Sequence, residues 1–387
     1  MLLQPCPCVG SFVVPTFNPN SVSRISVPSS YRHSKNLSNP RFSVNSPDPI
    51  ASVDALDRLV PRTKIKALSQ TKSNAQGLVQ VAFHFSLLWL AQLVAPISNA
   101  ASLLLTAFVS AFYFNGLHET VHRTAFASNV LNDVFAQIFG LLCLRPARHY
   151  YYYHWQHHRY TGNPELDSEL QPGFLDFPVS NVWSYLLYLS GIPFWIDAAI
   201  TTVKHALGHC PEAYLVHDKA CKTVTNEARI YLALYGLIWT LAATGGKSIS
   251  APLLRLWVLP ALLGQPFLRF YLLAEHRGRK RSPIIYENTR SMMGTNSFYR
   301  KLAWQMPYHI EHHAWPSLPF HKLTKAHELL ISAPNKGDDR GDDDCAPGTS
   351  GKDLLHSGEM YPELSQSGEG GYVGFNRRFL RTLVQRE

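Results

Sequence analysis

Charged side chains are scarce in this chain of 387 residues. Asp, Glu, Lys and Arg make up 16% of the sequence, whereas about 25% is usual in soluble domains, and hydrophobic residues make up 46%. Such a composition is typical of a membrane protein. The net charge of +9 lies partly in the N-terminal segment and partly in short runs such as residues 277–281, which resemble the basic residues that flank membrane helices. It forms no basic patch of the kind that binds nucleic acid.

Acidic residues are absent from residues 1–47, which contain ten Ser and several Pro. An acid-free, Ser-rich and basic leader is typical of an organellar transit peptide, and the lack of an uninterrupted apolar core argues against a secretory signal. Ser and Pro outnumber Arg, which favours a plastid over a mitochondrion. We therefore predict a transit peptide at residues 1–50 and a multi-pass protein of a chloroplast membrane. An untargeted tail is the alternative.

Cysteine is too sparse and too irregularly spaced to form a disulfide framework. Cys6 and Cys8 are too close together for an ordinary disulfide or a zinc knuckle, and they lie in the predicted leader. We predict unpaired thiols for the six cysteines, which are Cys6, Cys8, Cys143, Cys210, Cys221 and Cys345.

Charge is missing altogether from residues 73–117, and these 45 residues exceed twice the roughly 20 that a helix needs to cross a bilayer. The break at residues 95–99 divides them into a hairpin of two membrane-spanning helices. Residues 229–244 and 249–273 predict a second hairpin. Each hairpin starts and ends on one side of the membrane, so histidines that follow the two hairpins share that side.

Two further apolar segments are short or interrupted. Residues 130–144 and 177–196 are predicted to lie in the membrane interface rather than to span it. The expected fold is an all-α integral membrane protein with four transmembrane helices in two hairpins, interfacial helices, and a histidine-rich cap on the cytosolic or stromal side. A linker at 51–72 precedes a catalytic domain at 73–331. A disordered acidic insertion at 332–371 and a C-terminal element at 372–387 follow.

Histidine is what the sequence has in unusual supply. Three clusters have offsets of three and four residues, which place side chains on one face of a helix. The first cluster, or histidine box, is His118 and His122, the second is His154, His157 and His158, and the third is His309, His312 and His313. One further histidine, His276, brings the number to nine. Nine imidazoles are too many for one ion but suit two ions with four or five ligands each. Imidazole binds Fe, Cu, Zn and Ni alike. The apolar setting favours two irons that reduce O2 and attack a hydrocarbon chain.

The three histidine boxes, in this order and separated by apolar hairpins, resemble those of the membrane fatty acid desaturase/hydroxylase superfamily. The resemblance covers roughly residues 75–330 and 372–380. It implies that the nine histidines are iron ligands and that O2 is reduced to remove hydrogen from a methylene of an acyl lipid. We predict that three acids beside the boxes orient imidazole N–H groups, namely Glu119, Asp167 and Glu311.

The sequence contains no His-Pro-Gly-Gly motif of a fused cytochrome b5, so the electrons are expected from a separate protein, in a plastid ferredoxin. The basic residues 277–281 are a candidate dock for that acidic partner, or simply a membrane anchor. Within the same superfamily, a carotenoid hydroxylase or ketolase remains open.

Two alternatives come from other classes of protein. His118, Glu119 and His122 also fit the His-Glu-x-x-His motif of a zinc protease, which would leave at least six clustered histidines without a role. An inactive membrane scaffold is the other. Among the remaining histidines, those at 205, 209 and 217 are expected at a surface or an interface, and a supporting role stays open for His149 and His321.

Overall fold

The computed structural model describes residue 56 and residues 59–170, 178–292, 294–333 and 371–385. The chain divides into two units at residue 48, and every described residue belongs to the second unit, Pro49–Glu387. The predicted transit peptide at 1–50 and nearly all of the predicted acidic insertion at 332–371 lie outside the described residues.

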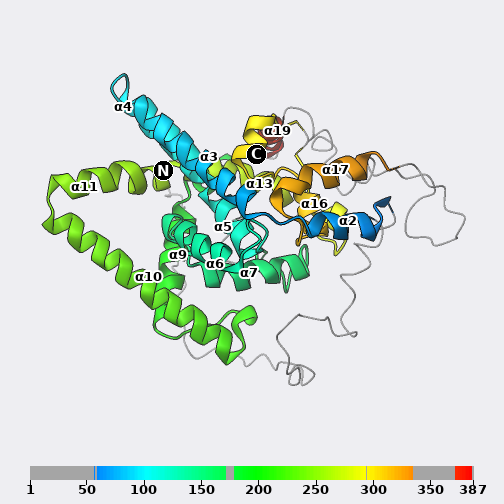
Figure 1. The fold of residues 1–387 in the computed structure, drawn as a ribbon, viewed down its shortest axis with the longest axis horizontal. Coiled ribbons are helices and arrows are strands. Elements are labelled where there is room, and N and C mark those ends of the chain that lie inside the picture. The colour runs from blue at the N-terminus through cyan, green and yellow to red at the C-terminus, as the bar shows by residue number, and fades with distance from the viewer. Residues whose placement is uncertain (1–55, 57–58, 171–177, 293, 334–370, 386–387) are drawn as a thin grey trace, which may run out of the picture. The chain divides into compact units, whose positions relative to one another are not determined.

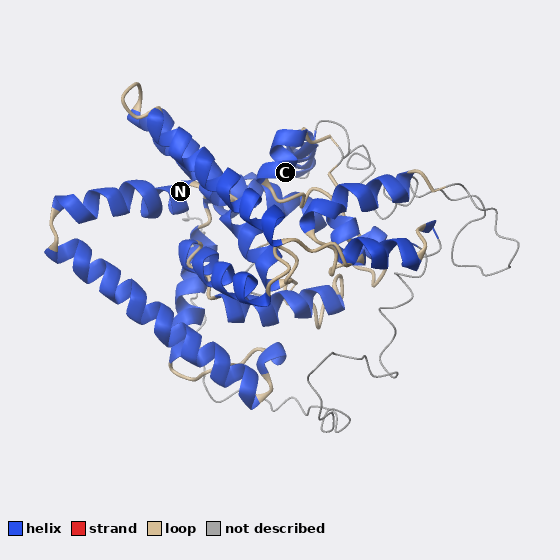
Figure 2. Cartoon of the chain, in the orientation of Figure 1, coloured by secondary structure: helices blue, strands red, loops and turns tan. Residues whose placement is uncertain are grey.

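The described part of the chain is helical and contains no strand, as Figure 2 shows. This confirms the predicted all-α class. The helices are α2 (Arg62–Ser69), α3 (Asn74–Leu93), α4 (Asn99–Ala111), α5 (Tyr113–Val121), α6 (Asn129–Leu142), α7 (Ala147–Tyr160), α8 (Val182–Ser190), α9 (Ile192–Ala206), η2 (Ala213–Leu215), α10 (Asp218–Thr244), α11 (Lys247–Leu253), η3 (Leu254–Val258), α12 (Leu259–Leu263), α13 (Gln265–His276), α14 (Ile285–Asn288), α15 (Ser297–Leu302), α16 (His309–Ala314), η4 (Phe320–Lys322), α17 (Leu323–Ile331) and α19 (Gly371–Val384).

The segment of the first predicted hairpin forms two helices, α3 and α4, that lie side by side (Figure 1). A serine hydroxyl caps each helix: Ser73 accepts a hydrogen bond from the backbone N–H of Gln76, and Ser98 accepts one from Ala101. Gln92 on α3 donates to the Thr106 hydroxyl on α4 at 2.6 Å. After α4 the chain continues into α5, which brings the first histidine box to the end of the hairpin.

Two helical stretches are long and apolar enough to cross a membrane, Asn99–Val121 and Lys247–His276. Two bent helix pairs meet the same test when each pair is taken together. One is α6 with α7, which meet at 99°, and the other is α8 with α9, which meet at 50°. The part of the chain that the structure describes therefore has two to four candidate spans. Helices α3 and α10 are not among them, since Gln and His interrupt α3 and the first half of α10 is charged. The four-span topology stays a prediction.

A buried carboxylate positions the helix that carries the second histidine box. Glu227 on α10 accepts hydrogen bonds from the backbone N–H of Arg148 at 2.8 Å and of His149 at 3.2 Å. These N–H groups belong to the first turn of α7, where a helix has no internal acceptors and where a negative charge is favourable. Glu227 thus holds the start of α7 against α10.

Two arginines within the predicted fourth span face protein. Arg269 is buried and lies over the ring of Phe194 at 4.3 Å, while its Nε donates to Gln265. Arg255 donates to Asn99 Oδ1 at 2.9 Å and so ties this helical stretch to the first hairpin. Both guanidinium groups have polar partners, which a charge at membrane depth requires.

The prediction of unpaired cysteines is wrong for one pair. Cys210 follows α9 and Cys221 lies in the first turns of α10, and their Cα atoms are 5.8 Å apart in a disulfide. The short η2 turn between the two helices folds the chain back on itself, which a spacing of 11 residues does not reveal.

The C-terminal element forms α19, which packs on α13 and α8. Its buried Asn376 accepts a hydrogen bond from the Tyr185 hydroxyl and donates to the carbonyl of Phe270.

Candidate metal centre

Four helices bring all nine predicted histidines together. Helix α5 carries His118 and is followed directly by His122, α7 carries His154, His157 and His158, α13 ends at His276, and α16 carries His309, His312 and His313. Seven of them are buried, and His158 and His276 are partly buried. The i, i+3 and i+4 offsets place the imidazoles of each box on one helix face, and the four faces converge.

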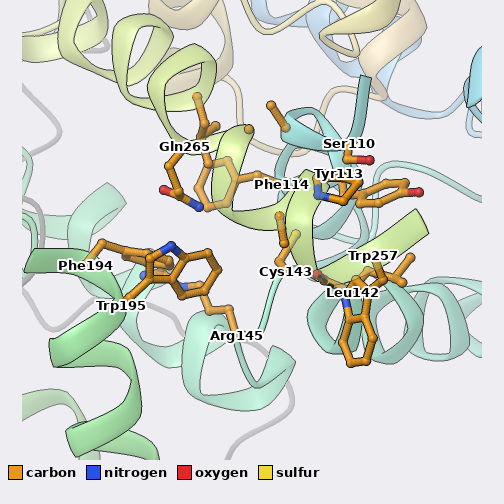
Figure 3. A pocket seen from close by; sticks show the side chains of 15 residues that line it. Ser110, Tyr113, Phe114, Leu142, Cys143, Arg145, Phe194, Trp195, Trp257 and Gln265 are labelled. Atoms are coloured by element: carbon orange, nitrogen blue, oxygen red, sulfur yellow. Dashed lines mark hydrogen bonds between the residues drawn. The ribbon is translucent and has the colours of Figure 1, made fainter. Parts of the chain in front are cut away.

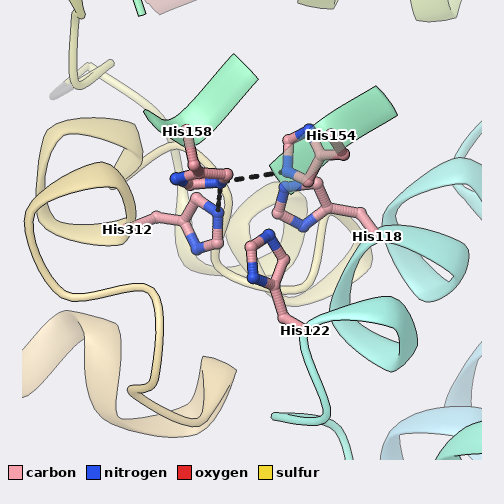
Figure 4. Close-up of side chains that lie close together, drawn as sticks. All are labelled: His118, His122, His154, His158 and His312. Atoms are coloured by element: carbon pink, nitrogen blue, oxygen red, sulfur yellow. Dashed lines mark hydrogen bonds between the residues drawn. The ribbon is translucent and has the colours of Figure 1, made fainter. Parts of the chain in front are cut away.

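Five of these histidines form a first group, drawn in Figure 4. Nε2 of His158 lies 3.0 Å from Nε2 of His154 and 3.0 Å from Nε2 of His312. The rings of His118 and His122 complete the group, with centroids 4.5 and 4.6 Å from that of His312. Three separate sequence boxes therefore contribute to one cluster.

The other four histidines form a second group beside the first. His157, His276 and His313 have their ligand atoms within 4.8 Å of one another. Nε2 of His309 lies 3.0 Å from that of His276 and 3.2 Å from that of His313, so this fourth ring joins them. The ring centroids of His158 and His313 are 4.2 Å apart, which connects the two groups.

The two groups have the properties of metal-ligand sets. Nε2 of His118 and both ring nitrogens of His122 are buried and have no hydrogen-bond partner among the described residues. Leaving such atoms unpaired costs about 1–3 kcal/mol each, which a bound cation would offset. Two nitrogens that bind one ion at about 2.1 Å and at right angles lie about 3 Å apart. The observed Nε2 separations match that distance.

Burial keeps the third box in the state that binds metal. Desolvation, together with the positive charges that neighbouring histidines would carry, lowers the pKa of His309, His312 and His313 well below the usual value for histidine. Neutral imidazole is the form that ligates a metal ion.

Four of the nine rings have Nδ1 held by an oxygen acceptor, which leaves Nε2 for a metal. The acceptors for His118 and His157 are carboxylates, Glu119 at 3.2 Å and Asp167 at 2.8 Å. For His276 the acceptor is the backbone carbonyl of Asn288 at 3.0 Å, and for His313 it is the Thr161 hydroxyl at 3.3 Å. Thr161 donates its own proton to the carbonyl of His157, so His313 must donate to Thr161.

The sequence profile of the fatty acid desaturase family matches residues 75–339, more than half of the chain. This chain belongs to the fatty acid desaturase family. The matched segment contains all nine histidines of the two groups.

A curated relative, the dihydrorhizobitoxine desaturase of Bradyrhizobium elkanii, is 26% identical over 232 residues. The match covers 56% of this chain and 63% of the relative, so the chain spans less than two thirds of the relative's length.

One of the three predicted supporting acids of this desaturase-family chain behaves differently from its prediction. Glu311 is fully buried, but its carboxylate accepts hydrogen bonds from His327 Nδ1 and from the Ser291 hydroxyl rather than from a histidine of the two groups. Glu311 points away from the two groups because α16 turns its neighbours toward them. Its contacts join α16 to α17 and to the segment before α15. His327 therefore contributes to the packing of α16 against α17 and contacts Glu311 rather than a histidine of the two groups.

Sequence reasoning missed several supporting residues. Asn288 and Thr161 act through a backbone carbonyl and a hydroxyl, which carry no sequence signal of their own. Glu275 is buried with its carboxylate 3.5 Å from Nδ1 of His309, and it directly precedes His276. Glu169 lies 3.7 Å from Nε2 of His157 and follows Asp167 by two residues. Both acids lie close to a predicted ligand in the sequence, and this position could have marked them as candidates for a supporting role.

Two small cavities of the desaturase-family domain have Phe114 in common, and one of them borders the histidines. Figure 3 shows a largely apolar cavity between α5, α9 and α12–α13, bordered by Phe114, Phe194 and Trp257. Phe114 also borders a second, smaller cavity whose lining includes His118 and His154. Phe114 is therefore the residue through which the apolar cavity adjoins the cavity beside the first histidine group.

Proposed function

We propose that this chain is an O2-dependent acyl-lipid desaturase whose nine histidines hold two irons. The observation that carries the proposal is the division of nine imidazoles, seven of them buried, into adjoining groups of five and four. Each group matches the number of imidazoles that one iron accepts, with positions left for a small molecule such as O2.

Two irons bound there would supply the oxidant that attacks an unactivated C–H bond. The overall reaction converts CH2–CH2, O2, two electrons and two protons into CH=CH and two molecules of water. The protein's own part is to fix the imidazoles. Glu119, Asp167 and Asn288 hold Nδ1 protons, so each Nε2 lone pair faces the metal without rotating.

The substrate side of the centre favours an apolar chain. Phe114 borders both cavities, and Tyr150 stacks on His154 with ring centroids 5.1 Å apart. Aromatic walls exclude water and accommodate methylene groups. The two cavities measure about 30 and 20 Å³, so an acyl chain would pass Phe114 and reach the first histidine group only after the lining side chains move apart.

Electrons are proposed to come from a separate acidic protein, a ferredoxin in a plastid. A cavity of about 150 Å³ is bordered by the ligand candidates His157 and His276 and by the basic side chains Arg277, Lys280 and Arg281. An acidic partner bound to those side chains would approach the second histidine group from outside the apolar cavities. The plastid membrane is the proposed location.

A carotenoid hydroxylase or ketolase is the alternative within the superfamily. The zinc protease is less compatible with the site, because His118 and His122 share their surroundings with three further histidines of the first group. Glu119 would also have to act on a water molecule, but its carboxylate is fully buried and bonded to His118 and Thr124.

The test is expression of the full chain in a host that supplies ferredoxin, followed by profiling of fatty acids and pigments. A new double bond in acyl chains is the expected result. A His312→Ala variant should abolish it, while His217→Ala, which changes an exposed histidine outside both groups, should not. An oxygenated carotenoid with unchanged acyl chains would refute the proposal, and equal product from His312→Ala would refute the metal assignment.

A further inference from the structure

Three titratable side chains form a cluster outside the nine histidines. His149 lies in the first turn of α7, His205 lies near the end of α9, and Glu212 directly precedes η2. Their possible ligand atoms lie within 4.8 Å of one another. His205 was expected at a surface or an interface, but only 1% of it is exposed, because α9 folds its last turn against α7. None of the three residues contributes to the proposed desaturase reaction.

We propose that His149, His205 and Glu212 form a binding site for a single zinc ion. Two imidazoles and one carboxylate are a ligand set that zinc uses in proteins, with water in the fourth position. Nε2 of His205 lies 3.0 and 3.1 Å from the two oxygens of Glu212. Two ligands of one tetrahedral zinc at about 2.0–2.1 Å lie about 3.3 Å apart, so little movement is needed to admit the ion.

The surroundings of the cluster favour a divalent cation. A cavity of about 390 Å³ adjoins His149 and Glu212, and two further carboxylates border it, those of Glu165 and Asp197. The opposing charge is Arg145, whose guanidinium lies over aromatic rings, 4.3 Å from that of Tyr150 and 4.8 Å from that of Tyr153. Three carboxylates against one guanidinium leave the cavity negative, and its volume leaves room for water on the ion.

Neighbouring contacts hold the three ligands in place. The Tyr214 hydroxyl lies 3.0 Å from Nε2 of His149 and fixes the orientation of that ring. Arg229 on α10 donates to the carbonyl of Ala206 at 2.8 Å, which anchors the end of α9. The disulfide at Cys210 tethers the loop that carries Glu212. These contacts already fix the three side chains, so zinc binding would need little further ordering of them.

The site would join the end of α9 to the start of α7. His149 precedes His154 by five residues, about 7.5 Å along a helix axis. A zinc ion at this point would hold the same helix that carries the second histidine box, without sharing a ligand with the two iron groups. Its role is therefore structural and separate from oxygen chemistry.

The test uses the full-length, iron-loaded protein in detergent, titrated with Zn²⁺ against a chromophoric chelator. The wild type should bind one zinc per chain. His205→Ala and Glu212→Gln should weaken binding by more than the 10–100-fold typical of losing a neighbour of a ligand. His209→Ala, an exposed histidine on the same segment, should bind as the wild type does. Equal zinc binding by the wild type and both ligand variants, or none by the wild type, would overturn the proposal.

Two measurements keep the result independent of folding and of the proposed desaturase activity. Iron content should be unchanged in Glu212→Gln, which shows that the two histidine groups are intact. Zinc-edge X-ray absorption of the wild type should show two imidazoles with oxygen ligands at about 2.0–2.2 Å. A shell of four or more imidazoles would place the zinc among the nine histidines and would contradict the site. Neither readout needs product formation.

Discussion

Glu227 offers the clearest test of how α10 positions the second histidine box. Only 7% of the residue is exposed, and its carboxylate accepts from the backbone N–H groups of Arg148 and His149. In Glu227→Ala these two donors lose their acceptor while they remain inside the protein. Each unsatisfied buried donor costs about 1–3 kcal/mol, so the expected loss of stability is roughly 2–6 kcal/mol.

The consequence should reach the metal centre through α7. Fraying of its first turn loosens the helix that holds His154, His157 and His158, so less iron should be retained. Thermal unfolding in detergent measures the first effect, and a shift of about 2–4 °C per kcal/mol is usual for domains of 150–250 residues. The Tm should therefore fall by at least about 4 °C. Iron content per chain measures the second effect.

Glu328→Ala is the matched control, because this glutamate also lies in a helix but is exposed and pairs with exposed Lys325. Its loss should cost less than about 1 kcal/mol and should leave iron content unchanged. A Glu227→Ala protein with the Tm and the iron content of the wild type would show that the carboxylate does not hold α7.

Three further outcomes follow from the packing and the ligand sets. Asp167→Ala should weaken iron binding by about 10–100-fold, measured by competition with a chelator, because His157 loses its acceptor; unchanged affinity would contradict that role. Gly116→Ala should destabilise the protein by about 1–3 kcal/mol, since a Cβ there would lie 2.7 Å from Phe139, whereas Gly236→Ala meets no atom within 4 Å and should be neutral or slightly stabilising by thermal unfolding. Removal of iron by a chelator should abolish double-bond formation and re-addition of Fe²⁺ should restore it, while restoration by Zn²⁺ alone would contradict the redox proposal.

The sequence predicted the histidines better than the membrane topology. Spacing within a helix is a local property, so His118 with His122, or His309 with His312 and His313, can be placed on one face from residue numbers alone. That the boxes meet follows from the requirement of a shared metal. Spans depend on what surrounds each helix, and α3 contains polar residues such as Gln80 and His84 that are buried against neighbouring helices.

The residues that support the histidines were only partly predictable. Glu119 and Asp167 lie close to their partners in sequence, and a carboxylate beside a box is a recognisable signal. Glu227 is 79 residues from Arg148, and the Asn288 carbonyl contacts His276 only because the chain turns back after α13. Glu311 contacts His327 and Ser291 instead of a histidine of the two groups, because adjacency in sequence does not fix the side of a short helix on which a side chain lies.

Helix α7 is where the two proposed metal sites meet. Its second half supplies three of the nine histidines, and its first turn supplies His149 and receives the Glu227 carboxylate. A substitution at His205 should therefore act on α7 through stability, with iron lost only when the first turn frays. A substitution at His158 should remove iron directly while the zinc site stays intact. Measuring iron and zinc in the same variant therefore distinguishes the structural zinc site from the iron-binding reaction centre. A measurement of product alone cannot make that distinction.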